Sequence, residues 1–238
     1  MEYGSETKEF IQKNIELIDS GNWKEFLTRV DLDFSMKDFS KNEIRQILAS
    51  CDIDPIKMQD VSRIPNCWYY KDPYLTQIII PDNIRAINQS AFRECVNLKE
   101  LKFPKGLTGL QYYAFLGCTS LERIDLKDSA IINLGSAIFQ DCTALKEAIL
   151  PKVMQHIGTC TFKNCTSLDN IILPKSLTVI DKEVFINCTS LSNIFFMGTM
   201  KEWKAVRRYD RCFVGVPTKI IICTDGITNL RPKTQWQG

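Results

Sequence analysis

The chain has 238 residues, of which 45% are hydrophobic and 24% are charged, as in an ordinary soluble globular protein. Its formal net charge of +2 excludes a strong overall attraction to nucleic acid or to an anionic membrane. The longest apolar runs, such as Ile78–Ile80, are far too short to cross a bilayer, and the polar start MEYGSETKEF does not resemble a signal peptide. We therefore expect a cytoplasmic protein that makes no contact with a membrane.

Residues 1–66 lack the periodicity of the rest of the chain and are predicted to form helices. Ile11, Ile15 and Ile18 fall on one helical face. Ser40–Glu43 fits a capping box ahead of a further apolar helix. Because the open end of a repeat protein must be shielded from water, we expect these helices to form an α-helical N-terminal cap. The alternative is an independent binding domain.

Residues 67–196 repeat a pattern of 23 or 24 residues. Each copy has a phenylalanine, a cysteine three residues later and a leucine three residues after that. The five phenylalanines are Phe92, Phe115, Phe139, Phe162 and Phe185. A unit of this size cannot bury its apolar residues alone, so the units must stack and share one core. We predict a solenoid in which these phenylalanines form a single interior column.

Within each unit, the segment L-x-x-I-x-L predicts a short strand whose apolar residues face inward. A proline ends the strand in several units, and a second short extended piece follows, such as Leu177–Ile180. The unit that continues after Leu126 has one extra residue and no proline, which predicts a surface loop and an unchanged core register. Half of the 10 cysteines recur at one repeat position, so we expect them to be reduced and buried.

The repeat I-x-x-x-A-F-x-x-C-x-x-L-x-x-I-x-L-P-x-x-L resembles the BspA-like class of leucine-rich repeats over about residues 71–226. Residues 157–177, which read IGTCTFKNCTSLDNIILPKSL, are a close instance. The closing segment is similar to the same class, with Gly198, Thr199 and Trp203 followed by C-T-D-G at 223–226. The resemblance implies a right-handed α/β-type leucine-rich-repeat solenoid of mostly short strands, used for recognition and commonly found on bacterial or protist surfaces. The helical cap resembles segments of uncharacterised bacteriophage and gut-anaerobe repeat proteins.

The exposed side of the predicted strands is the candidate binding surface. In L-x-x-I-x-L, the residues between the inward positions point outward and form two columns across the stacked strands. One column places Ile149, Ile172 and Phe195 side by side, and adjacent large apolar residues on an exposed face usually mark a contact site. The expected polar rim contains Glu100, Lys102, Arg123, Asp125, Glu147 and Asn170. This combination favours a protein partner over a small molecule. The alternative is that the C-terminal segment or a second subunit covers the stripe.

Residues 197–238 are predicted to close the solenoid with a helix, a strand and a tail. Trp203 and Val206 are expected to face inward, with basic residues on the solvent side of the helix. These basic residues are Lys201, Lys204, Arg207, Arg208 and Arg211. We interpret them as a solvated helix face; the alternative function for the chain is nucleic-acid binding through this basic helix.

No residue pattern indicates catalysis. His156 is the only histidine, which leaves little material for a metal site or a Ser-His-Asp arrangement. The sequence has no C-x-x-C, phosphate loop or G-x-G-x-x-G motif. We therefore predict a non-catalytic module that binds a partner protein and uses no cofactor or metal. A more specific hypothesis is a phage-encoded protein that blocks a host factor; the sequence leaves the partner's identity and the oligomeric state open.

Overall fold

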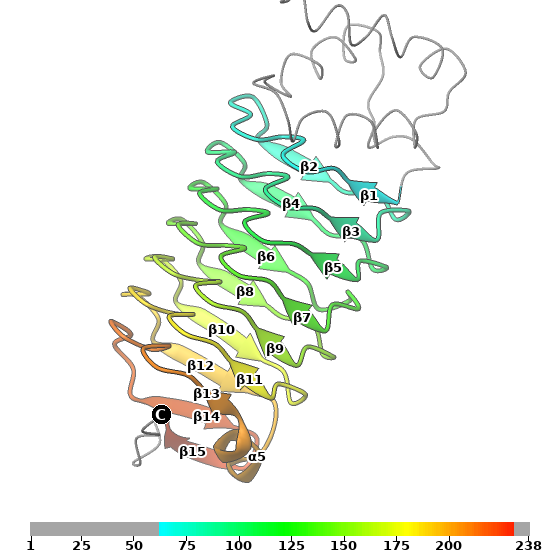
Figure 1. Cartoon of the computed structure of the whole chain (residues 1–238). Helices are drawn as coiled ribbons and strands as arrows, with labels where there is room; N and C mark the ends of the chain where they lie inside the picture. Colours follow the sequence, from blue (N-terminus) through cyan, green and yellow to red (C-terminus); the bar gives the residue numbers. More distant parts are fainter. Residues whose placement is uncertain (1–61, 231–238) are drawn as a thin grey trace, which may run out of the picture.

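The computed structural model describes residues 62–230 and shows a β-solenoid of stacked turns (Figure 1). The predicted leucine-rich-repeat architecture is confirmed. Most of the predicted N-terminal helical cap, residues 1–61, lies outside the described residues. The last part of that segment is extended rather than helical, because β1 (Arg63–Ile64) pairs with a strand of the next turn. The solenoid therefore begins inside the segment that was assigned to the cap.

The longer strands form the first face of the solenoid, and those before residue 197 carry the L-x-x-I-x-L segments. In chain order they are β2 (Gln77–Ile79), β4 (Glu100–Lys102), β6 (Arg123–Asp125), β8 (Glu147–Ile149), β10 (Asn170–Leu173), β12 (Asn193–Phe196), β14 (Ile220–Cys223) and β15 (Gly226–Asn229). Hydrogen bonds join these strands into two sheets. One sheet has six strands, in the order β6, β8, β10, β12, β14 and β15, and the other is the pair β2 and β4. Neighbouring strands are parallel, except that β14 and β15 form an antiparallel hairpin at the end.

Two-residue strands form the second face. They are β1, β3 (Ala86–Ile87) and β5 (Gly109–Leu110) in one sheet, and β7 (Asn133–Leu134), β9 (His156–Ile157), β11 (Val179–Ile180) and β13 (Arg207–Arg208) in another. The extra residue of the third unit lies between β6 and β7. The register on both sides of it is kept, since Asp125 pairs with Ile149 and Asn133 with His156, as predicted.

A tight turn centred on the repeated phenylalanine forms the third side of each coil. The residues two before and two after the ring have positive φ, as at Cys160 (58°) and Asn164 (60°) around Phe162. This left-handed conformation reverses the chain around the ring. Gly, Asn and Asp adopt this conformation at the lowest cost. They occupy the position two residues after the ring in five of the turns, as Gly117, Asp141, Asn164, Asn187 and Gly215.

The repeated rings form one interior column, as predicted. From Phe92 to Phe185, successive rings are stacked with centroids 5.0, 5.5, 5.7 and 5.5 Å apart, and all are buried. Tyr69 and Phe213 extend the column by one ring at each end, at 4.9 and 5.4 Å. These centroid distances lie within the range that is favourable for aromatic pairs. One hydrophobic core therefore runs through the described part of the solenoid.

A short helix and the β14–β15 hairpin close the C-terminal end. The helix α5 (Met200–Ala205) begins with a capping box, in which the Thr199 side chain accepts the Glu202 amide and the Glu202 carboxylate accepts the Thr199 amide. The ring of Trp203 lies 5.4 Å from that of Phe196, and Val206 is also buried. The two predicted inward positions of the closing segment are thus confirmed.

Candidate interaction face

The register of the first face brings the predicted apolar residues together. Ile172 on β10 pairs with Ile149 on β8 and with Phe195 on β12. Residues in register on neighbouring parallel strands point to the same side of the sheet, about 4.8 Å apart. The three side chains therefore form a contiguous stripe on the outer side, while Ala148, Ile171 and Ile194 between the two outward columns are buried.

The structure continues this stripe over two strands that the sequence reasoning did not include. Phe195 pairs with Ile222 on β14, and Ile222 pairs with Ile227 on β15. We call the five residues Ile149, Ile172, Phe195, Ile222 and Ile227 the apolar stripe. The repeat pattern stops after Phe196, which hid the last two members. The alternation of Ile220–Cys223, with Ile221 and Cys223 buried, is the signal that could have found them.

The stripe is open to solvent to different degrees along its length. Ile149, Ile172, Phe195 and Ile222 are half-buried, because each is flanked by side chains of the neighbouring strands. Ile227, on the last strand, is 60% exposed. Ile220, which continues the second outward column next to the stripe, is 44% exposed. The apolar surface therefore widens toward the C-terminal hairpin.

Charged side chains on β6 and β8 border the stripe and neutralise one another. The Arg123 guanidinium lies 2.6 Å from the Glu147 carboxylate and 3.5 Å from that of Asp125. The hydrogen bond to Glu147 raises the pKa of Arg123 above its usual value. Lys127 also pairs with Asp125, at 3.2 Å. These pairs are largely exposed and add little to stability, but they leave no strong net charge at this edge of the stripe.

The polar column beside the stripe is linked by side-chain hydrogen bonds. The Asn193 amide donates to the side-chain oxygen of Asn170 at 2.9 Å, and the Asn170 amide donates to Asp169 at 3.0 Å. Both asparagines are half-buried. The first bond links two stacked strands and the second holds the Asn170 amide against the residue before it, so both amides have fixed partners.

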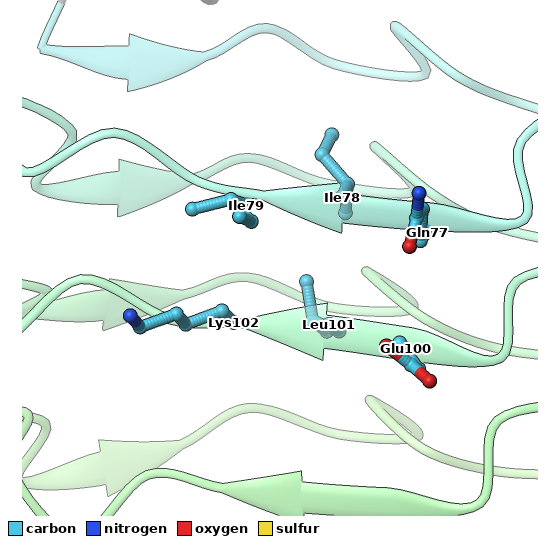
Figure 2. A pocket seen from close by; sticks show the side chains of 6 residues that line it. All are labelled: Gln77, Ile78, Ile79, Glu100, Leu101 and Lys102. Carbon is cyan, nitrogen blue, oxygen red and sulfur yellow. The ribbon is translucent and has the colours of Figure 1, made fainter.

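Glu100 and Lys102 lie at the other end of the same face, on β4. They border a shallow cavity of about 520 Å³ between β2 and β4, shown in Figure 2. It is lined by Gln77, Ile78, Ile79, Glu100, Leu101 and Lys102. Since β6 lies between this cavity and the apolar stripe, the two are separate features, and Glu100 and Lys102 do not border the stripe directly.

The predicted basic face of the closing helix is wrong. The helix ends at Ala205, so Lys201 and Lys204 are its only members among the five basic residues. Arg207 and Arg208 form β13, which pairs with β11. Arg208 donates to the main-chain oxygen of Trp203 at 2.6 Å and lies over the Trp203 ring, 4.6 Å from its centroid, and burial lowers its pKa. A two-residue strand has no periodicity that the sequence could reveal, which explains the error.

The fifth basic residue, Arg211, also lies outside the helix and has an acidic partner. Its guanidinium lies 3.0 Å from the carboxylate of Glu183, and Lys163 lies 3.2 Å from the same side chain. The pKa of Glu183 is lowered, first of all by its hydrogen bond to Lys163. Arg211 is thus part of a mixed-charge cluster rather than of a basic surface.

The side chains that could carry chemistry are dispersed. His156 pairs with Asp181 at 2.9 Å on the second face, away from the stripe. Within residues 62–230, no group of three or more His, Cys, Asp or Glu side chains is placed to hold a metal ion. In the same part of the chain, no helix is both long and apolar enough to span a bilayer.

The stacked turns and the exposed sheet face define a leucine-rich-repeat solenoid, a fold that generally serves as a non-catalytic scaffold for protein interaction. The sequence matches the family described as BspA type Leucine rich repeat region, in 6 copies, over residues 62–192 and 128–232. These matches cover more than half of the chain, and the chain belongs to this family. No match was found among curated proteins.

Solved structures of bacterial leucine-rich-repeat proteins are similar to this chain. A Treponema pallidum protein, TpLRR, is 26% identical with a TM-score of 0.53, over 56% of this chain and 61% of that one. A leucine rich cell surface protein from Faecalibacterium prausnitzii is 31% identical with a TM-score of 0.53, over 56% and 35%. The pneumococcal vaccine antigen PcpA, at 18% identity and a TM-score of 0.51, shares the fold alone. This chain thus spans about three fifths and one third of the first two.

Proposed function

We propose that this chain binds a partner protein on the outer side of its first face, through the apolar stripe. The observation that carries the proposal is the register of Ile149, Ile172, Phe195, Ile222 and Ile227, which places five large apolar side chains in one row. An apolar centre with a polar edge is the arrangement of a protein-binding surface. The edge here is the hydrogen-bonded Asn170–Asn193 column and the Arg123–Glu147 ion pair.

The charge distribution favours an apolar contact over an electrostatic one. The charged residues next to the stripe are paired with one another, so they contribute orientation and specificity more than attraction. The basic C-terminal residues are divided between a helix, a strand and a mixed-charge cluster. They therefore offer no continuous basic track for a phosphate backbone, and we do not carry the nucleic-acid alternative forward.

The test is capture of the partner with surface variants. The full chain carrying Ile149→Asp, Ile172→Asp and Phe195→Asp is used as bait in an extract of the source cell, alongside the unchanged chain. We expect the wild-type chain to retain specific proteins and the triple variant to lose at least nine tenths of them, because three carboxylates would be buried in the contact. Equal recovery by a correctly folded triple variant contradicts the proposal.

A matched control uses the same outward column of the first face, in the separate β2–β4 pair. Ile79 occupies the equivalent outward position on β2, is 73% exposed and lies outside the stripe. Ile79→Asp is therefore expected to leave capture unchanged. Far-UV circular dichroism and the thermal transition of every variant establish that the solenoid is intact. The narrower hypotheses, a cytoplasmic location and a phage protein that blocks a host factor, stay predictions; the identity of the captured proteins tests them.

A further inference from the structure

The apolar stripe has the same sequence of side chains when read from either end. In register order it is Ile149, Ile172, Phe195, Ile222 and Ile227, with Phe195 at the centre and two isoleucines on each side. The antiparallel β15 strand supplies the final member, since Ile227 lies directly opposite Ile222. A row of this kind is complementary to a second copy of itself turned by 180°, which is the requirement for an isologous interface.

We infer that the partner of the stripe is a second copy of this chain, related by a two-fold axis that runs parallel to the strands over Phe195. This inference rests on the proposed function of the stripe and names its occupant. In this arrangement Phe195 faces its own counterpart, Ile172 faces Ile222, and Ile149 faces Ile227. The mean strand directions of the two sheets stay aligned, as in ordinary face-to-face sheet packing.

The polar column beside the stripe is compatible with this pairing. A rotation about an axis along the strands keeps each column over its counterpart. Glu147 therefore faces Asn229, Asn170 faces Ile220, and Asn193 faces Asn193 of the second copy, so no like charges meet in this column. Asp125 and Arg123 lie on β6, one strand beyond the paired region, where they extend past the β15 edge of the other copy.

The extent of the patch sets the expected strength of association. Five strands at about 4.8 Å spacing cover roughly 24 Å along the solenoid. A patch of that length that is only two side-chain columns wide is small for a specific interface. We therefore expect a reversible dimer that forms in the micromolar range rather than a permanent one. Sedimentation velocity of the full chain from about 5 to 200 μM is the measurement, with a twofold rise in mean mass expected. A single species at the monomer mass up to 200 μM overturns the inference.

The register is tested by complementary charges. Ile172→Lys alone and Ile222→Glu alone are each expected to stay monomeric, because each places an unpaired charge against an isoleucine of the other copy. An equimolar mixture of the two is expected to recover the dimer, because Lys and Glu then meet across the two-fold axis. The matched control mixes Ile172→Lys with Ile149→Glu, whose side chains are not opposite, and is expected to remain monomeric. Recovery in both mixtures or in neither overturns the register.

A second measurement covers the case in which a charged variant unfolds. Phe195→Cys treated with a short bis-maleimide is expected to yield a covalent dimer, since this residue faces itself. Ile79→Cys, in the same column but outside the stripe, is expected to link no more than the wild-type chain. Equal linking of the two variants overturns the inference. If the wild-type chain is monomeric but still captures a different protein through the stripe, self-association fails while the proposed function stands.

Discussion

The thiol of Cys142 donates a hydrogen bond to the main-chain oxygen of Phe115, one turn earlier in the solenoid, with an Sγ–O distance of 3.2 Å. The same bond joins each repeat cysteine to the aromatic residue of the preceding turn. The other four pairs are Cys95–Tyr69, Cys118–Phe92, Cys165–Phe139 and Cys188–Phe162, at 2.8 to 3.1 Å. The cysteine of the repeat therefore does more than fill space. It gives a second hydrogen bond to a buried carbonyl that already accepts an amide of its own turn, as the Phe115 oxygen does from the Cys118 amide at 3.2 Å.

Replacement of Cys142 by alanine tests this role. The variant loses the only sulfur donor to the Phe115 oxygen and leaves a small void in a fully buried site. We expect the free energy of unfolding to fall by about 1–3 kcal/mol, because the variant loses one hydrogen bond and the packing of the buried sulfur. Urea unfolding followed by circular dichroism measures it. The control is Cys160→Ala, because Cys160 is half-buried and outside the ladder; its change should stay within about 0.5 kcal/mol. If Cys142→Ala and Cys160→Ala lower the free energy of unfolding equally, the hydrogen bond of Cys142 does not stabilise the turn.

The buried thiols also predict a loss of stability at alkaline pH. Burial raises the pKa of Cys118, Cys142, Cys165 and Cys188, in the last case to about 12. Above pH 9 the thiols of the unfolded chain ionise while those of the folded chain stay neutral, so the unfolded state is favoured. Each thiol contributes about 1.4 kcal/mol per pH unit between its unfolded and folded pKa. This stability is complete below about pH 8.5 and is lost as the pH rises toward 12.

Urea unfolding at pH 7, 9, 10 and 11 measures this dependence. Lysines and tyrosines titrate in the same range, so the comparison is between the wild-type chain and Cys142→Ala. The variant lacks one of the buried thiols and should lose stability less steeply with pH. Identical slopes for the two chains would show that the Cys142 thiol ionises equally in both states.

At Gly158 the backbone of the preceding turn lies too close to leave room for a side chain. A Cβ added at Gly158 would lie 2.7 Å from the Leu134 oxygen and 2.8 Å from the carbonyl carbon of Gly135, and neither backbone atom can move freely. We expect Gly158→Ala to lower the free energy of unfolding by about 1–3 kcal/mol, the usual cost of overpacking. At Gly109 the nearest atom to an added Cβ is the Ala86 Cβ at 3.8 Å. Gly109→Ala should be neutral or stabilising by up to about 1 kcal/mol, and the pair can be compared by thermal melts.

The sequence predicts the repeated part of this fold well because the repeat carries the physical constraints. The ring column from Phe92 to Phe185 and the register of Ile149, Ile172 and Phe195 follow from one spacing. The turns at the ends were missed because they lack the full pattern: three residues after Tyr69 stands Asp72, and three after Phe213 stands Val216. At Asp72 the carboxylate accepts the amides of Tyr74 and Leu75, so this position makes local bonds where the later turns have the thiol.

The candidate site was predictable only as far as the repeat extends. Ile222 and Ile227 join the stripe through strand pairing at the C-terminal hairpin, where no repeat spacing fixes the register. The basic residues after Ala205 were placed on a helix because Trp203 and Val206 have helical spacing. In the structure the helix stops first, since the main chain of Arg207 and Arg208 pairs with β11 and the Arg208 side chain packs on Trp203. Tertiary contacts therefore determine both the extent of the apolar stripe and the end of α5.

The capping box of α5 holds the C-terminal closure in place, and Thr199→Ala tests it. The Thr199 hydroxyl accepts the Glu202 amide at 3.2 Å, and the Glu202 carboxylate accepts the Thr199 amide at 2.7 Å. We expect the free energy of unfolding to fall by about 0.5–2 kcal/mol, as for other N-cap threonines. Thr189→Ala is the matched control, because Thr189 is exposed and its hydroxyl makes only a long bond of 3.5 Å to the Thr166 oxygen.

The same box predicts a dependence on acidic pH. The bonds from Thr199 lower the pKa of Glu202, together with Lys175. A carboxylate with a lowered pKa stabilises the folded state above its unfolded pKa, and this contribution disappears as the pH falls through the folded value. The difference in unfolding free energy between wild-type and Glu202→Gln should therefore shrink between about pH 5 and pH 3, where glutamate is protonated. A difference that stays constant over this range would mean that the charge of Glu202 plays no part in holding α5.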